Sequence, residues 1–288
     1  MKRDQIILLI KYIDPMYLWS FLEGDVHFAS LNYFREEEIR NQDKVLGDRA
    51  EGAIFDYGNV SEVAKLGQDI QALSSEQVKI LMDNVSLEQK IPFEIGISPE
   101  DRNKIGIASF FAITYDDVMK DPNRNRVHGV DMYCIKSNVI KDMEDFNRGY
   151  DRIPVVIPFK DILLGTFTKQ QIDFDKIGYY DSQKYQSKIV NEVKEKSIRA
   201  VFYKRKEYAG QREFRLITEI SDSEKGDTVR VPIVTNLTKM YGKEILPQLV
   251  FGWKEDPEVT TRLSQCEKTL LFGNSKTCIK LVGHIPPG

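Results

Sequence analysis

The sequence predicts an α+β fold, with a single domain built on a mainly antiparallel (mixed) sheet, flanking helices and one helical insertion. Two observations lead to this prediction. Segments with the period of a strand and segments with the period of a helix follow one another without the strict alternation of a parallel α/β protein. No repeat or low-complexity linker divides the chain, so we expect one domain over residues 1–288, with the insertion at about 60–100.

Each element is predicted from a local pattern. Runs of branched or alternating residues predict strands, and apolar residues at helical spacing predict helices. Asp14-Pro15 is typical of an N-cap followed by the first turn of a helix, and Ser74 with Gln77 fits a capping box. Two prolines place the segment 152–159 at a sheet edge. The expected strands are 5–13, 25–34, 104–114, 130–137, 152–159, 213–220, 228–234, 249–252 and 278–282, and the expected helices are 15–24, 60–91, 181–199 and 257–271.

Three connections complete the predicted fold. Strand 228–234 pairs with strand 213–220 as a hairpin across the turn 221–227. The charged segment that follows residue 34 forms a long surface loop or a short helix. The terminal strand–helix–strand unit adds a parallel pair of strands.

Composition limits the classes of function. The net charge of −3 argues against a protein that binds nucleic acid over its whole surface. The longest apolar run, Ile6 to Ile10, is too short to cross a membrane, and no cleavage site of a signal peptide follows it. The three cysteines form no Cys-x-x-Cys pair and the three histidines have no metal-ligand spacing, so we expect a cytoplasmic protein without a metal site. Carboxylates, hydroxyls and arginines remain as the candidate catalytic groups.

The stretch "KRKEYAGQREFRLI", residues 204–217, is the first candidate for a functional site. Side chains two apart on a strand share a face, which places Gln211, Glu213 and Arg215 together. The more common setting for such a charged face is a solvated edge strand. The alternative is a face that lines a cleft.

Gly210-Gln211-Arg212-Glu213 resembles the Gln-x-Glu motif of the mono-ADP-ribosyltransferase toxins. This resemblance implies that Glu213 stabilises the oxocarbenium-like centre at the nicotinamide ribose of NAD, and that Gln211 orients a protein or nucleic-acid acceptor. The family also carries an arginine or histidine on an early strand and a Ser-Thr-Ser strand between. This chain has Lys11 and Tyr12 early, and Ser109 or Ser30 in the middle. The implied catalytic residues are Glu213 and Gln211, and the implied NAD-binding residues are Lys11, Tyr12, Ser109, Arg215 and Tyr208.

A broader resemblance covers most of the chain. The segments "IKYI", "VHFASLNYF", "KEYAGQREFRLI" and the terminal strand–helix–strand are similar to those of an uncharacterised bacterial and phage domain family. Members of this family look like accessory or defence-island proteins. The resemblance implies a toxin or an antiphage-defence effector.

Two further groups of residues are candidates for ligand binding. In "GDRAEG", residues 47–52, Asp48 and Glu51 form either a metal-binding or substrate-binding carboxylate pair or a turn with solvated charges, and we expect the solvated turn. A basic cluster with interleaved aromatic residues either binds a phosphate-bearing ligand or is solvated. Its basic members are Arg199, Lys204, Arg205, Lys206, Arg212 and Arg215.

Two alternatives to the transferase hypothesis remain open. One is a metal-dependent nuclease in which Asp48, Glu51 and Glu213 hold Mg²⁺ for phosphodiester hydrolysis. The other is a non-catalytic antiphage-defence module that binds a partner through an aromatic surface.

Overall fold

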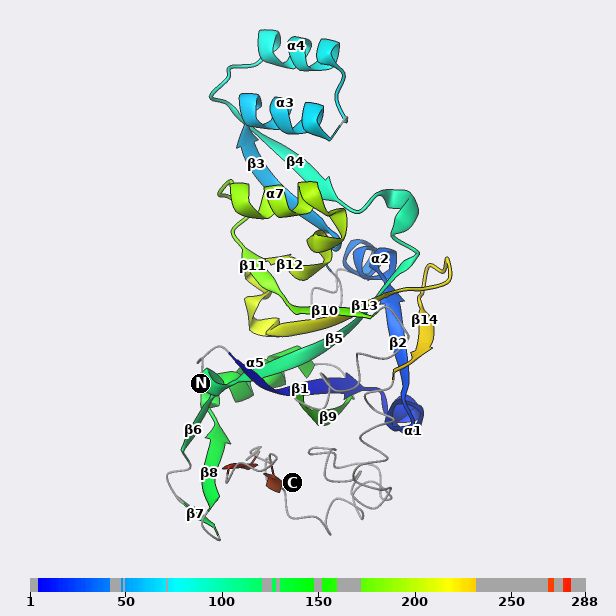
Figure 1. The fold of residues 1–288 in the computed structure, drawn as a ribbon, viewed down its shortest axis with the longest axis vertical. Helices are drawn as coiled ribbons and strands as arrows, with labels where there is room; N and C mark the ends of the chain where they lie inside the picture. Colours follow the sequence, from blue (N-terminus) through cyan, green and yellow to red (C-terminus); the bar gives the residue numbers. More distant parts are fainter. Residues whose placement is uncertain are drawn as a thin grey trace.

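The computed structural model describes residues 5–41, 48, 50–70, 72–120, 126–127, 130–147, 152–159, 172–231, 269–271 and 277–280. Helices and strands are mixed around a curled, antiparallel sheet of seven strands, which confirms the predicted α+β fold (Figure 1). The strands of this main sheet are β1 (Ile6–Ile13), β2 (Asp25–Ser30), β5 (Ile105–Thr114), β9 (Ile153–Pro158), β10 (Asp173–Lys176), β13 (Glu213–Glu219) and β14 (Asp227–Arg230).

The long strand β5 organises the main sheet, whose order is β10-β13-β5-β1-β9. Along one side β5 pairs with β13, from Glu213 opposite Phe111 to Glu219 opposite Ile105. Along the other side it pairs first with β1, at residues 111–114, and then with β2, at residues 106–107. The sheet therefore splits on this side of β5, because β1 and β2 pair with different parts of it.

Alternation along the strands builds apolar layers on both faces of the sheet. One face carries Leu9, Phe110 and Phe214, which join a cluster that also contains the buried Phe21 of α1 (Leu18–Leu22). On the opposite face, α5 (Ser137–Asn147) covers a cluster that includes Phe111. Ile107 and Ile217, farther along that same face, belong to a separate apolar cluster. Ser109, Glu213 and Arg215 lie between these last two clusters.

A long hairpin extends from the main sheet and carries two helices at its tip (Figure 1). Its strands are β3 (Ala53–Asn59) and β4 (Lys90–Gly96), and the helices are α3 (Val60–Asp69) and α4 (Ser75–Asn84). The capping box that the sequence predicts at the start of α4 is present, with the Gln77 amide donating to Ser74 Oγ over 3.2 Å. The helix α7 (Ser187–Glu195) packs on this hairpin through Val190 and Val193.

Smaller sheets complete the described chain. The strands β11 (Gly178–Tyr180) and β12 (Tyr203–Arg205) pair in parallel beside the hairpin. A further sheet contains β6 (Val118–Lys120), β7 (Arg126–Val127), β8 (Val130–Ile135), β15 (Thr269–Leu271) and β16 (Thr277–Lys280). The parallel pair predicted near the C-terminus involves β16, but its partner is β8. The predicted strand 249–252 and most of the predicted helix 257–271 lie outside the described residues, while Thr269–Leu271 form a strand and not the end of that helix.

Two further predictions are also wrong, and local geometry explains both. Strand β2 ends at Ser30 because its hydroxyl accepts from the Tyr33 amide and caps α2 (Leu31–Asn41), so residues 31–34 are helical. Strand β14 pairs with β2 and not with β13, since both edges of β13 are already occupied by β5 and β10. None of the helices within the described part of the chain is long and apolar enough to span a membrane.

Candidate functional site

A cavity of about 500 Å³ opens where β1 and β2 diverge along β5. This volume falls within the range of small-molecule sites, which combine an apolar lining with a few converging polar groups. Rings from several elements supply the apolar part. The cavity is lined by the charged or polar Lys11, Tyr12, His27, Ser109, Arg152, Lys204, Gln211 and Glu213, and by the aromatic Tyr17, Phe21, Phe34, Phe111 and Phe146, among others.

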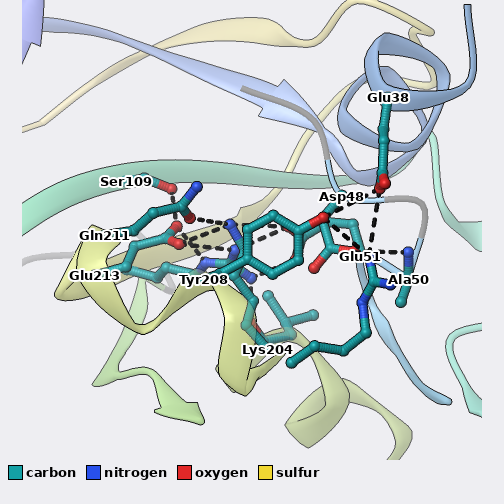
Figure 2. A network of polar contacts seen from close by, with 12 residues as sticks. Glu38, Asp48, Ala50, Glu51, Ser109, Lys204, Tyr208, Gln211 and Glu213 are labelled. Carbon is teal, nitrogen blue, oxygen red and sulfur yellow. Dashed lines mark hydrogen bonds and ion pairs between the residues drawn. The ribbon is translucent and has the colours of Figure 1, made fainter. Parts of the chain in front are cut away.

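Glu213 is a buried carboxylate in the wall of this cavity, with only 4% of its surface exposed. It is the first residue of β13. The Ser109 hydroxyl on β5 donates to its Oε1, and Lys204 Nζ contacts its Oε2 at 2.9 Å (Figure 2). Arg215 Nε donates to Oε1 over 2.6 Å. The carboxylate is thus held by groups from three strands, β5, β12 and β13.

Arg215 lies behind Glu213 and joins it to a second buried carboxylate. Its Nη2 donates to Glu51 Oε2 over 2.9 Å, and its Nη1 donates to Glu51 Oε1 and to the Val201 carbonyl. Lys204 Nζ lies 3.6 Å from Glu51 Oε2, so both cations touch both carboxylates. Two positive and two negative groups balance, and a buried set of charges is tolerated in this paired form.

The two carboxylates of this network differ in their pKa values. Burial raises the pKa of Glu213, but Arg215 and Lys204 outweigh burial and hold that pKa well below its usual range. For Glu51 burial prevails over the same two cations, and its pKa is raised. A proton added to the pair therefore goes to Glu51, and the carboxylate that lines the cavity stays ionised.

Asp48 extends the network on its far side, through a second arginine. Arg205 contacts Asp48 Oδ1 at 3.0 Å and Glu38 Oε2 at 3.4 Å, and it donates to the Tyr208 hydroxyl over 2.9 Å. Asp48 and Glu51 are each only 1% exposed. The expectation of a turn with solvated charges is therefore wrong, because both carboxylates are buried against arginine side chains.

The structure also corrects the interpretation of the basic cluster and of its strand. Lys204, Arg205, Arg212 and Arg215 each form ion pairs with carboxylates, so they do not make an open basic surface. Strand β13 lies between β10 and β5, and Glu213 and Arg215 are buried. The solvated edge strand, which was the more common alternative, is therefore wrong.

Contrary to the prediction from the sequence, Gln211 does not share a strand face with Glu213 but is linked to it through Lys204. It ends a 3₁₀ helix (Lys206–Gln211) and is not on the strand, since Arg212 takes a left-handed conformation with φ 45°. Ion pairs from Arg212 to Asp117 Oδ1 at 2.6 Å and to Asp142 Oδ2 at 2.7 Å hold this turn. Lys204 then links the two predicted catalytic residues, because its Nζ donates to Gln211 Oε1 over 2.9 Å and pairs with Glu213.

Lys11 and Tyr12, on β1, also line the cavity. Lys11 Nζ donates to the Ser109 carbonyl over 2.9 Å and lies 5.2 Å from the centre of the Phe110 ring. Burial, with Arg152 as a second cause, lowers the pKa of Lys11 to about 8, while Glu213 opposes this change. The Tyr12 hydroxyl donates to the Met143 carbonyl, and burial raises its pKa.

Two residues named with the NAD-binding set lie elsewhere. Arg215 is fully buried behind Glu213. Tyr208 lines a neighbouring cavity of about 400 Å³, which shares Phe146 and Gln211 with the first. In contrast, Arg152 and Phe146 line the first cavity, and sequence reasoning missed both because no local pattern distinguishes them.

No family model, no curated protein and no solved structure matches this chain. Among the residues that the structure describes, no three His, Cys, Asp or Glu side chains are grouped so that they could hold a metal ion. The functional argument therefore rests on the cavity and its charged groups.

Proposed function

We propose that this protein is an NAD-using transferase of ADP-ribosyltransferase-like type, an effector or toxin that modifies a protein or nucleic acid. One observation carries the proposal. The resemblance implies a functional group on an early, a middle and a late strand, and Lys11, Ser109 and Glu213 line one cavity from β1, β5 and β13. These three strands are neighbours in the sheet.

The ionised state of Glu213 supports this chemistry. In the transfer, the bond from the ribose C1′ of NAD to the nicotinamide nitrogen breaks, and its electron pair leaves with nicotinamide. Positive charge develops on the ribose, and a preorganised carboxylate in a water-poor cavity stabilises such charge strongly. The acceptor then forms the new bond to C1′ and loses a proton.

Ser109 is the group that a substrate hydroxyl would replace. A carboxylate offers about four lone-pair positions, and those of Glu213 accept from Ser109, Lys204 and, twice, Arg215. Lys204 and Arg215 are fixed by their contacts with Glu51. The Ser109 hydroxyl can rotate away, so a ribose hydroxyl takes its place on Glu213 in our proposal.

Release of nicotinamide from NAD tests the proposal. Purified wild type should release nicotinamide, and Glu213→Gln should reduce the rate by about 10²-fold or more, as loss of a charge-stabilising group does in other enzymes. Glu219→Gln is the matched control, since Glu219 lies on the same strand but is exposed. Release by Glu213→Gln at the wild-type rate would overturn the proposal, as would wild type that leaves NAD intact.

Expression in bacteria gives a second, independent measurement. Wild type should slow growth while cellular NAD falls, and Glu213→Gln should do neither. Toxicity with unchanged NAD and degraded nucleic acid would instead favour the nuclease alternative. Equal growth with wild type and Glu213→Gln would favour the binding module.

A further inference from the structure

Besides Lys11 and Lys204, the wall of the cavity contains a third cation, Arg152. It immediately precedes β9, which pairs with β1 so that Pro154 lies opposite Tyr12. Lys11 and Arg152 are far apart in the chain but line the same cavity, and Arg152 is close enough to contribute to the lowered pKa of Lys11. Glu213 lies in the same cavity but on β13, two strands away from β1 in the sheet.

The Arg152 guanidinium is held in a defined orientation. Its Nε donates to Asn147 Oδ1 over 3.3 Å and its Nη2 to the Phe146 carbonyl over 2.9 Å. Its central carbon lies 5.3 Å from the centre of the Phe146 ring and 5.8 Å from that of the Tyr12 ring. Stacking on aromatic rings fixes the plane of a guanidinium, and a planar fork matches the oxygens of a phosphate.

Lys11 is half-buried, and its partners differ from those of the buried cations of the site. Lys204, Arg205 and Arg215 each contact carboxylates closely. Within the described residues, Lys11 makes no ion pair, and its hydrogen bond goes to the neutral Ser109 carbonyl. Like charges and burial both disfavour an ammonium group, and the lowered pKa of Lys11 agrees with this cost. An anion bound beside Lys11 would offset it.

We propose that Lys11 and Arg152 form a subsite for a phosphate or diphosphate group of the ligand that enters this cavity. The inference rests on the proposed function only for the identity of that ligand. If the ligand is NAD, the bound group is its diphosphate. The cavity is also lined by aromatic rings, which suit the uncharged parts of the ligand.

Calorimetric titration with ADP, and with adenosine as the phosphate-free probe, tests the subsite. Wild type should bind ADP at least ten-fold more tightly than adenosine. Arg152→Met and Lys11→Met should each remove most of that difference, and Arg152→Lys should retain part of it. Arg40→Met is the control, because Arg40 is exposed on α2 and does not line the cavity. Equal affinities for ADP and adenosine, or ADP binding unchanged in a folded Arg152→Met, would overturn the proposal.

Two further measurements distinguish failure of the subsite proposal from misfolding of a variant and from failure of the proposed function. In wild type alone, added salt should weaken ADP binding and leave adenosine binding unchanged, because salt screens charge interactions; identical salt dependence would contradict the subsite. The second measurement is nicotinamide release by the same wild-type preparation. Nicotinamide release without preferential ADP binding would overturn only the subsite, and ADP binding without release would overturn only the proposed function.

Discussion

Glu213 is a buried carboxylate that remains ionised because Lys204 and Arg215 surround it. Its partner Glu51 balances the second of the two positive charges. Each member of this set depends on the other three, since an unpaired charge in a protein interior is costly. Single substitutions here should therefore affect both stability and the candidate site.

Arg215→Met should destabilise the protein by about 3 kcal/mol, because it leaves two buried carboxylates, Glu51 and Glu213, beside one cation, Lys204. The free energy of unfolding in urea measures this loss. Arg40→Met, an exposed position on α2, is the control and should change stability little. A loss below about 1 kcal/mol for Arg215→Met, the range of surface pairs, would show that the network does not hold its charges as described.

Lys11→Met should stabilise the protein while it weakens ligand binding. The pKa of Lys11 falls from 10.5 to about 8 on folding, so the unfolded chain binds the proton more tightly and the buried ammonium costs stability at pH 7. We expect a gain of roughly 2 kcal/mol, less than the shift alone implies, because the bond to the Ser109 carbonyl is lost. Two charged groups, Arg152 and Glu213, act on the pKa of Lys11, and Lys11 in turn lowers the pKa of His27.

The pH dependence of that gain provides the check. The cost is fully present below pH 8 and disappears as the pH rises towards 10.5. The difference between Lys11→Met and wild type should therefore shrink between pH 7 and pH 9.5 in urea unfolding. A destabilised Lys11→Met at pH 7 would contradict this account.

At the scale of the elements, strand β5 has no room for a larger side chain at Gly106, where it pairs with β2. A Cβ atom added at Gly106 would lie 2.6 Å from Ile220 Cγ2 and 2.7 Å from Phe28 Cβ. Gly106→Ala should therefore destabilise the protein by about 1–3 kcal/mol through overpacking. Gly210→Ala is the matched control, because its Cβ would meet only Asp142 Oδ1 at 3.8 Å. Equal melting temperatures for the two variants would contradict the tight packing at Gly106.

At the same scale, periodicity and caps predicted most of the strands and helices near the site. These patterns gave the wrong structure where a single residue changes the backbone conformation within a segment. Ser30 begins a helix inside an alternating segment, and the left-handed Arg212 separates Gln211 from the strand it was assigned to. Neither conformation follows from spacing, because each depends on a hydrogen bond or ion pair made in the folded chain.

For the whole molecule, the burial of the site comes from contacts between distant parts of the chain. The sequence predicted that Glu213 and Arg215 share a face, which the structure confirms. It could not predict that Glu51, from the turn before β3, would bury that face, or that β10 would cover the free edge of β13. Charged residues in a glycine-bounded turn look solvated until their partners, more than a hundred residues later, are known.

Acid should lower the free energy of unfolding, in part because Glu213 becomes protonated. Its pKa is lower in the folded state than the ordinary value of 4.5, so its contribution to stability is present above pH 4.5 and is lost as the pH falls below it. The difference in unfolding free energy between wild type and Glu213→Gln should therefore be largest near pH 7 and should decrease below pH 4.5. A difference that stays constant between pH 7 and pH 3.5 would contradict the lowered pKa.

The interior position of β13 also has a consequence for biosynthesis. Lys11, Glu51 and Ser109 leave the ribosome early, whereas Lys204, Glu213 and Arg215 follow much later. A nascent chain that stops before Glu213 lacks the central carboxylate, and it also lacks the strand that lies between β5 and β10. Translation must therefore pass this strand before the cavity can be complete, which delays any activity of the site until most of the chain has been made.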